Sequence, residues 1–187
     1  VEALTKRSFA HYSHCRELGM TWRPFSELAE QLKLNANSDH ELIPEAKWLP
    51  HERLVVDLFS SVLPTVVNHW MNWQDRLGSV RKLQIGKSRS ADGWTDGKSF
   101  IAIDRAFLQA NRLDIEGIAA IAALLVHEYC HSDADTGTHV HGEEFYRNFH
   151  DNGTLWIPKI TKKVFRKLPQ YMESRGLRPT KGQLADR

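Results

Sequence analysis

The sequence predicts an α+β fold in which helical segments flank a small sheet, and three observations lead to this prediction. Apolar residues recur at helical spacing over a long stretch before residue 78. Two short segments between residues 80 and 104 have the apolar and polar pattern of strands. Helical spacing then returns after residue 114 and continues through most of the remaining chain. This order of segments is typical of an α+β protein.

The first part of the chain is predicted to be a helical N-terminal portion, residues 1–78. Residues 1–34 have the pattern of two short helices, and residues 35–50, with two prolines, are expected to form a loop. Residues 51–77 carry a long apolar repeat of helical period, so we expect a helix that is kinked or broken at Pro64.

The predicted sheet follows. Residues 80–86 alternate and indicate a strand, and residues 88–97 contain two Asp-Gly pairs, which are strong turn signals. Residues 99–104 indicate a second strand, followed by a short helix at 105–110. If the second strand lies at an edge, it could hold a substrate backbone by β-addition, although an ordinary sheet strand is an equal alternative.

Asp114 is positioned to cap the clearest helix of the chain. The helix is Ala-rich and apolar on more than one face, which predicts a buried central helix. A polar loop at 132–140, a helix at 141–149 and a last helix at 158–175 complete the prediction. Residues 79–152 would then form the central core, and residues 153–187 would form a basic helix and tail. Together with the N-terminal portion, these two regions would make one compact domain.

Composition limits the functional classes. With 187 residues, 41% hydrophobic and 26% charged, the chain can build a core, and its net charge of +2 gives no global case for nucleic acid or membrane binding. No segment approaches the ~18 consecutive apolar residues of a membrane span. Two cysteines exclude a disulfide framework and a four-Cys zinc ribbon, and they fit a reducing, cytoplasmic location. Because Val1 stands where Met would begin a chain, we expect either a processed product or a piece of a longer, multidomain protein.

Five of the ten histidines lie between residues 127 and 150, namely His127, His131, His139, His141 and His150. His127 to His131 form an H-E-x-x-H motif near the end of the predicted central helix. Residues i and i+4 share one helix face, so the two imidazoles can reach one tetrahedral zinc ion. Glu128 would lie beside the metal without ligating it, as the general base that accepts a proton from an activated water and passes it to the leaving amine.

Several residues are candidates for the third metal ligand. We favour His141, at the start of the next predicted helix, where Phe145 and Phe149 would anchor that helix to the core. His139 is the main alternative, and if it does not bind the metal it would support a ligand or bind substrate. The weaker alternatives are Asp133, Asp135, Glu143 and Glu144. Tyr146 and His150 share one face at i, i+4 spacing and are candidates for stabilising the transition state.

These motifs resemble the zincin metallopeptidases of the SprT-like and WLM kind. That family carries a strand, a helix with H-E-x-x-H, and a short helix opening with His-Gly-x-x-Phe, which correspond here to residues 99–104, 127–131 and 141–145. The resemblance covers about residues 80–150. It implies a zincin-like core and a minimal zinc endopeptidase that acts on a protein or peptide, with Glu128 as base and three histidine ligands. The chain lacks the Cys-rich zinc ribbon after the core.

Two other functional classes are alternatives. One is a catalytically inactive zincin-fold interaction module. The other is a nucleic-acid-associated protein with a structural zinc, because residues 151–187 hold nine basic and three acidic residues, a net charge of +6. We favour a solvated helix face as the explanation of that charge.

Overall fold

A computed structural model describes residues 40–71, 80–131 and 141–177. The chain divides into a unit of residues 1–39 and a unit of residues 40–187, and all described residues belong to the second. The predictions for residues 1–34 and 132–140, and the tail after residue 177, lie outside the described residues. The described elements are β1 (His40–Leu42), the 3-10 helix η1 (Glu45–Lys47), α3 (Pro50–Ser60), α4 (Leu63–Met71), β2 (Lys82–Ser88), β3 (Gly93–Thr95), β4 (Phe100–Asp104), α5 (Arg105–Ala110), α6 (Ile115–Tyr129) and α7 (Glu143–Glu173).

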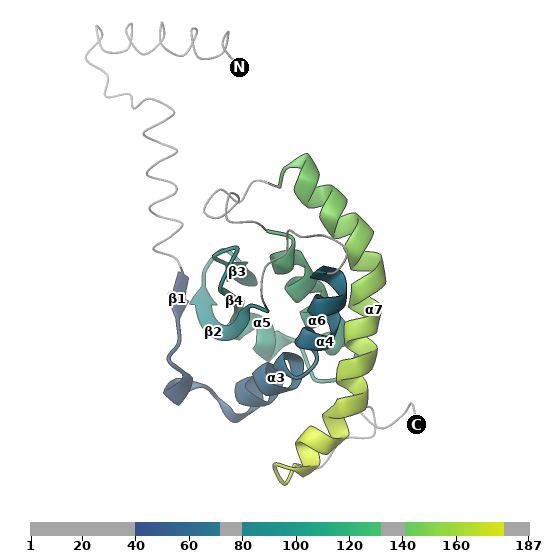
Figure 1. The fold of residues 1–187 in the computed structure, drawn as a ribbon. Coiled ribbons are helices and arrows are strands. Elements are labelled where there is room, and N and C mark those ends of the chain that lie inside the picture. Colours follow the sequence, from purple (N-terminus) through teal and green to yellow (C-terminus); the bar gives the residue numbers. More distant parts are fainter. Residues whose placement is uncertain (1–39, 72–79, 132–140, 178–187) are drawn as a thin grey trace, which may run out of the picture. The chain divides into compact units, whose positions relative to one another are not determined.

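The fold is α+β, as predicted, with a four-stranded sheet in the order β1-β2-β4-β3 (Figure 1). β2 and β4 run parallel in the centre, and β1 and β3 are antiparallel to their neighbours at the two edges. The sequence pattern predicted β2 and β4 but missed β1 and β3. Each of these edge strands has only three residues, too few to establish an alternating pattern.

The alternative in which residues 99–104 form an edge strand is wrong. β4 pairs with β2 on one side and with β3 on the other. Four successive residues of β4, from Ile101 to Asp104, are buried, as expected for a strand covered on both faces. The edge position next to it belongs to β3, which lies in the segment predicted as turns because of its two Asp-Gly pairs.

α6 is the buried central helix that the sequence predicts. The Asp114 side chain accepts a hydrogen bond from the Gly117 backbone N–H at 2.9 Å and caps its first turn. The apolar residues that have no exposed surface are Ile118, Ile121, Ala122, Leu125 and Val126. α6 packs against β3, β4 and α7, so its last turn is held between the sheet and a second helix.

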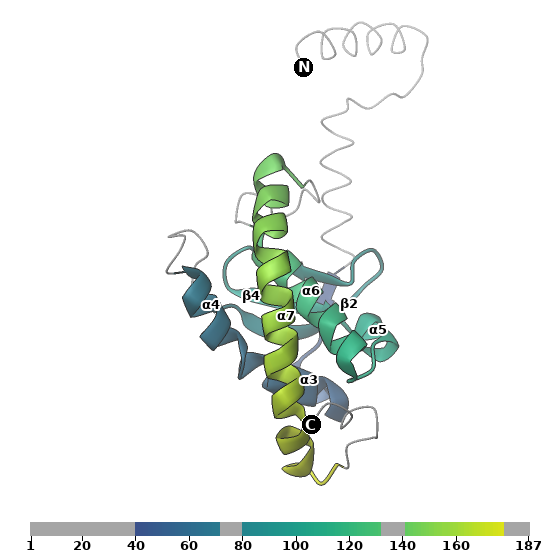
Figure 2. The ribbon, with the colours of Figure 1, turned by 90° about the vertical axis from the view of Figure 1, so that its right-hand side faces the viewer.

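The separate helices predicted at 141–149 and 158–175 are wrong, because α7 is one helix of 31 residues. Gly153 and Pro158 lie within this helix, but Pro158 is exposed and the buried residues continue through Trp156, Ile160 and Val164 at helical spacing. α7 packs on α6, α3 and α4, and Figure 2 shows it passing across these helices. This packing offsets the cost of the two prolines inside the helix, Pro158 and Pro169.

The predicted break near Pro64 is observed slightly earlier in the chain. α3 ends at Ser60 and α4 begins at Leu63, so the chain bends at residues 61–62. Pro64 then occupies the first turn of α4, where a missing backbone N–H leaves no intrahelical bond unmade. Among the described helices, none combines the length and the apolar character needed to cross a lipid bilayer.

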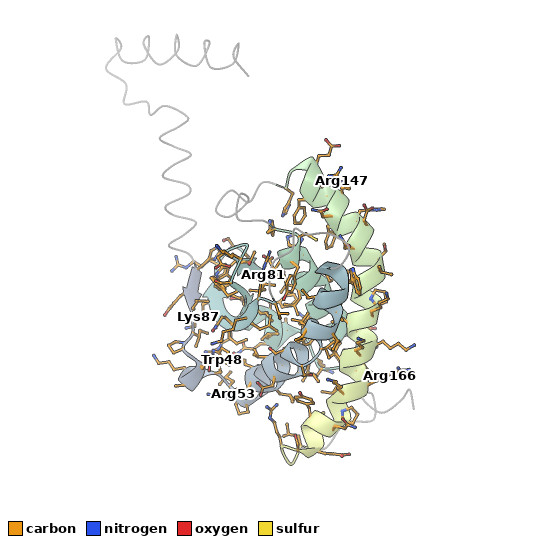
Figure 3. The ribbon with its side chains drawn as sticks, in the orientation of Figure 1. Trp48, Arg53, Arg81, Lys87, Arg147 and Arg166 are labelled. Atoms are coloured by element: carbon orange, nitrogen blue, oxygen red, sulfur yellow. The ribbon has the colours of Figure 1, made fainter. Side chains whose placement is uncertain are left out.

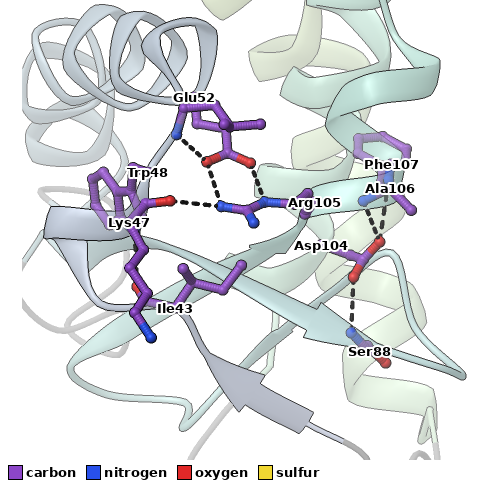
Figure 4. A network of polar contacts seen from close by, with 10 residues as sticks. Ile43, Lys47, Trp48, Glu52, Ser88, Asp104, Arg105, Ala106 and Phe107 are labelled. Carbon is purple, nitrogen blue, oxygen red and sulfur yellow. Dashed lines mark hydrogen bonds and ion pairs between the residues drawn. The ribbon is translucent and has the colours of Figure 1, made fainter.

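A buried polar network joins α3 to the sheet (Figure 4). The Arg105 side chain donates to Glu52 Oε1 at 2.5 Å and to Glu52 Oε2 at 2.9 Å, and also to the Lys47 carbonyl. Glu52 has no exposed surface. Next to Arg105, the Asp104 carboxylate caps α5 and also accepts from the Ser88 backbone N–H. The start of α5 is thereby fixed to α3 and to the end of β2.

Candidate metal centre

Three histidines lie together at one end of α6. His127 and His131 are one turn apart, and their Nε2 atoms are 3.4 Å apart. His141, two residues before α7, lies against both, with ring centroids 4.9 Å from His127 and 5.1 Å from His131. One nitrogen from each ring lies within 4.8 Å of the others, so the cluster could hold a metal ion.

The separation of one pair of donor atoms, on His127 and His131, is that of a tetrahedral metal site. Two imidazole nitrogens at zinc–nitrogen distances of about 2.0–2.1 Å in a tetrahedral site are separated by about 3.3–3.4 Å. The His127–His131 separation of 3.4 Å agrees with this value. Three imidazoles would complete three of the four positions of such a site.

Of the residues considered for the third ligand, His141 is the one that the structure places with the pair. His139, Asp133 and Asp135 lie outside the described residues, and so does the side chain of Glu144. Glu143 is exposed at the start of α7. His141 reaches the pair because α7, which begins two residues later, packs against α6.

A phenylalanine supports all three rings. Phe145 is 4% exposed and stacks on His141, with ring centroids 4.1 Å apart. The same ring lies 4.6 Å from His131 and 4.8 Å from His127. Phe149, one turn further along α7, contacts His127 at 5.6 Å. These apolar contacts restrict the imidazole rings and keep water from one side of the cluster.

The electrostatics of the cluster favour metal binding. Burial and the neighbouring His141 lower the pKa of His127, which keeps its imidazole neutral, with a lone pair available to a metal. Glu128 is 4% exposed, and its Oε1 lies 4.0 Å from His127 Nε2. Burial raises the pKa of Glu128 to about 7, although the positive charge of Arg81 acts in the opposite direction.

The two candidates for transition-state stabilisation have different surroundings. Tyr146 is 61% exposed, and its ring centroid lies 5.9 Å from that of His141, at the border of the cluster. His150 is exposed on α7, with Nδ1 3.7 Å from the Asp151 carboxylate. Tyr146 therefore lies beside the histidine cluster, whereas the described contact of His150 is with its own neighbour in the chain.

Arg81 is a residue of this site that the sequence analysis missed. It is 4% exposed, and its guanidinium donates to the backbone carbonyls of Glu128 and His131. A sequence signal for it exists. Alternate residues of a strand point to the same face of the sheet, so Arg81 is expected on the face that carries the buried residues Leu83 and Ile85. A charged residue on the apolar face of a strand requires a partner in the core.

Comparisons with protein-family models, curated proteins and solved structures found no match. The chemistry of the three histidines and of the buried Glu128 therefore carries the functional conclusion.

Proposed function

We propose that this protein is a zinc-dependent peptidase with a zincin-like core. The observation that carries the proposal is the cluster of His127, His131 and His141, beside which lies the buried carboxyl group of Glu128. The three histidines would hold the zinc ion. Three protein ligands leave a fourth position open, which is typical of catalytic zinc and differs from the four protein ligands of a structural site.

Zinc bound at these histidines would supply Lewis acidity that polarises a substrate carbonyl and acidifies a water molecule. Glu128 is the residue that accepts the proton of this water and delivers it to the departing amine. Its Oε1 atom lies 4.0 Å from His127 Nε2, so its carboxylate would lie beside a metal ion held by His127. Tyr146, at the exposed border of the cluster, is the better placed of the two candidates to donate a hydrogen bond to the developing oxyanion.

The substrate we propose is a peptide bound in extended form along β3. This strand packs against α6 and, among the described residues, pairs through one edge only, with β4. A substrate backbone could add to the other edge, which is the common way in which a sheet edge binds an extended peptide.

The proposal is tested on purified protein by metal analysis and by hydrolysis of a denatured, fluorescently labelled casein. We expect about one zinc per chain and a rise in melting temperature when zinc is added. Glu128→Gln should retain zinc and lower the hydrolysis rate by about 10²–10⁴-fold. The matched control is Glu116→Gln, an exposed carboxylate on the same helix that should keep full activity. Protein that contains no zinc and is not stabilised by it would refute the proposal.

The same experiment separates the peptidase from an inactive zincin-fold interaction module. In the inactive module, Glu128→Gln would change neither hydrolysis nor any cellular effect, while zinc would still be bound.

A basic face on α7 favours a second candidate function, contact with nucleic acid. The five basic residues have the spacing i, i+3, i+4, i+7, i+8 and lie on one helix face, namely Lys159, Lys162, Lys163, Arg166 and Lys167. Three of them are engaged within the protein, since Lys163 donates to Thr65, Lys167 donates to Ser61, and the Lys159 ammonium lies 4.5 Å from the centre of the Trp156 ring. This function predicts salt-dependent binding of duplex DNA that survives Glu128→Gln and is lost when Lys162 and Arg166 are neutralised.

A further inference from the structure

Arg81 lies immediately before β2, and Figure 3 labels it where the sheet meets α6. Its guanidinium carbon is 5.2 Å from the centre of the Tyr129 ring, and its backbone N–H donates to the Tyr129 hydroxyl at 3.1 Å. The residue therefore contacts the H-E-x-x-H segment with both its main chain and its side chain.

The guanidinium binds the two ends of one turn. Nη1 donates to the Glu128 carbonyl at 2.6 Å, and Nη2 donates to the His131 carbonyl at 2.8 Å. Both acceptors belong to residues of the proposed metal centre. The planar guanidinium fixes the angle between its donors, so these two bonds hold the two carbonyls in one relative position.

His131 needs such a support because it lies beyond the regular helix. α6 ends at Tyr129, and the His131 backbone N–H donates to the Glu128 carbonyl at 3.3 Å, an i to i−3 bond. The carbonyls of a last helical turn have no partner within the helix, and a cation is favoured at this end of the helix dipole. Arg81 supplies both the donors and the positive charge.

The same guanidinium reaches β3. Nη1 also lies 3.3 Å from Thr95 Oγ1, and this hydroxyl donates in turn to the Phe100 carbonyl of β4. The end of α6 is thus connected through one side chain to the edge strand that we propose as the substrate-binding strand.

We propose that Arg81 is a positioning residue of the metal centre. Its guanidinium sets the position of the His131 backbone relative to His127 and to β3. The proposal rests on the proposed zinc function. Residues that orient metal ligands through hydrogen bonds typically contribute 10–100-fold to metal affinity.

The test uses the full chain with Arg81→Lys, which keeps the charge but cannot hold two carbonyls in a fixed fork. Zinc affinity is measured by competition with a chelator, and ligand geometry by the visible absorption of the Co²⁺-substituted protein. We expect affinity to fall by about 10–100-fold and the Co²⁺ bands to shift. A merely structural role would lower the melting temperature and leave both readouts at wild-type values.

Arg105→Lys is the matched control, because Arg105 also binds a buried group and lies in α5, in the separate network with Glu52. It should lose stability and keep the wild-type zinc affinity and Co²⁺ spectrum. If the Arg81 variant does not fold, Thr95→Val removes one acceptor of the guanidinium, and we expect a smaller loss of affinity with a shifted spectrum.

Folded Arg81→Lys or Thr95→Val with wild-type affinity and spectrum would overturn the role of Arg81 and leave the zinc proposal standing. Wild-type protein that binds neither metal would overturn both.

Discussion

Glu128 and Arg81 are two ionisable residues that the fold buries at the same end of α6. The carboxyl group faces the histidines, and the guanidinium binds the backbone behind them. Burial raises the pKa of Glu128 to about 7. A base with a pKa near the working pH can both accept a proton and release it. The same burial has a cost, because the ionised carboxylate is poorly solvated in the metal-free protein.

This cost predicts a pH-dependent stability for metal-free protein. The pKa of Glu128 is raised from 4.5 to about 7 on folding, so the folded state binds an extra proton between these values and stability falls as pH rises through them. Glu128→Gln lacks this loss. Urea unfolding with a chelator present measures the free energy of unfolding of both proteins. At pH 4.5 or below, we expect the variant to match wild type, apart from a small constant difference. At pH 8, we expect the variant to be more stable than wild type by about 3 kcal/mol.

The control for this prediction is Glu116→Gln, which should keep the wild-type pH profile. An identical pH profile for Glu128→Gln and wild type would contradict the burial of an ionisable group at this position.

At the scale of elements, α7 connects the site to the rest of the described fold. Its N-terminal end carries His141 and Phe145 to the cluster, and its later turns pack against α3 and α4. The position of the third histidine therefore depends on the continuity of the helix across Gly153 and Pro158.

Gly153 in α7 tests this continuity, and Gly117 in α6 provides a contrast. A Cβ at Gly153 would meet Ile157 Cδ1 at 3.6 Å, an ordinary contact, so Gly153→Ala should stabilise the protein by about 0.5–1 kcal/mol. A Cβ at Gly117, in α6, would lie 1.7 Å from the Arg112 carbonyl oxygen, so Gly117→Ala should destabilise it by about 2 kcal/mol or more. Urea unfolding measures both. Destabilisation by Gly153→Ala would indicate a break in α7.

At the scale of the described domain, the ion pair of Glu52 and Arg105 holds α3 against α5 and the sheet. Burial alone would raise the pKa of Glu52, but hydrogen bonds from Arg105 and from the Leu49 backbone N–H lower it below 4.5. The contribution of the ionised pair is therefore present above pH 4.5 and is lost as pH falls below this value.

We expect Arg105→Ala to lower the free energy of unfolding by about 3 kcal/mol at pH 7, because it leaves a buried carboxylate without its cation. Lys82→Ala, which removes the exposed pair with Glu45, is the control and should change stability little. If Arg105→Ala lowered the free energy of unfolding as little as Lys82→Ala does, the buried carboxylate of Glu52 would not require the Arg105 cation for stability.

Much of the site was predictable because it depends on local geometry. The i, i+4 spacing placed His127 and His131 on one face of a helix, and the Asp114 cap with its apolar repeat indicated a buried central helix. The short edge strands β1 and β3 were not predictable, since three residues carry too little pattern to distinguish a strand from a turn.

The sequence by itself determined the α+β class, α6 and the histidine pair, because helical periodicity and capping act between residues close in the chain. Only the tertiary structure decided that α7 is continuous, that His141 joins the pair and that Arg81 binds the end of α6. These features depend on contacts between distant residues, 50 apart for Arg81 and His131. Such contacts form only when helices and sheet pack together, and packing energy can override a local signal such as Pro158.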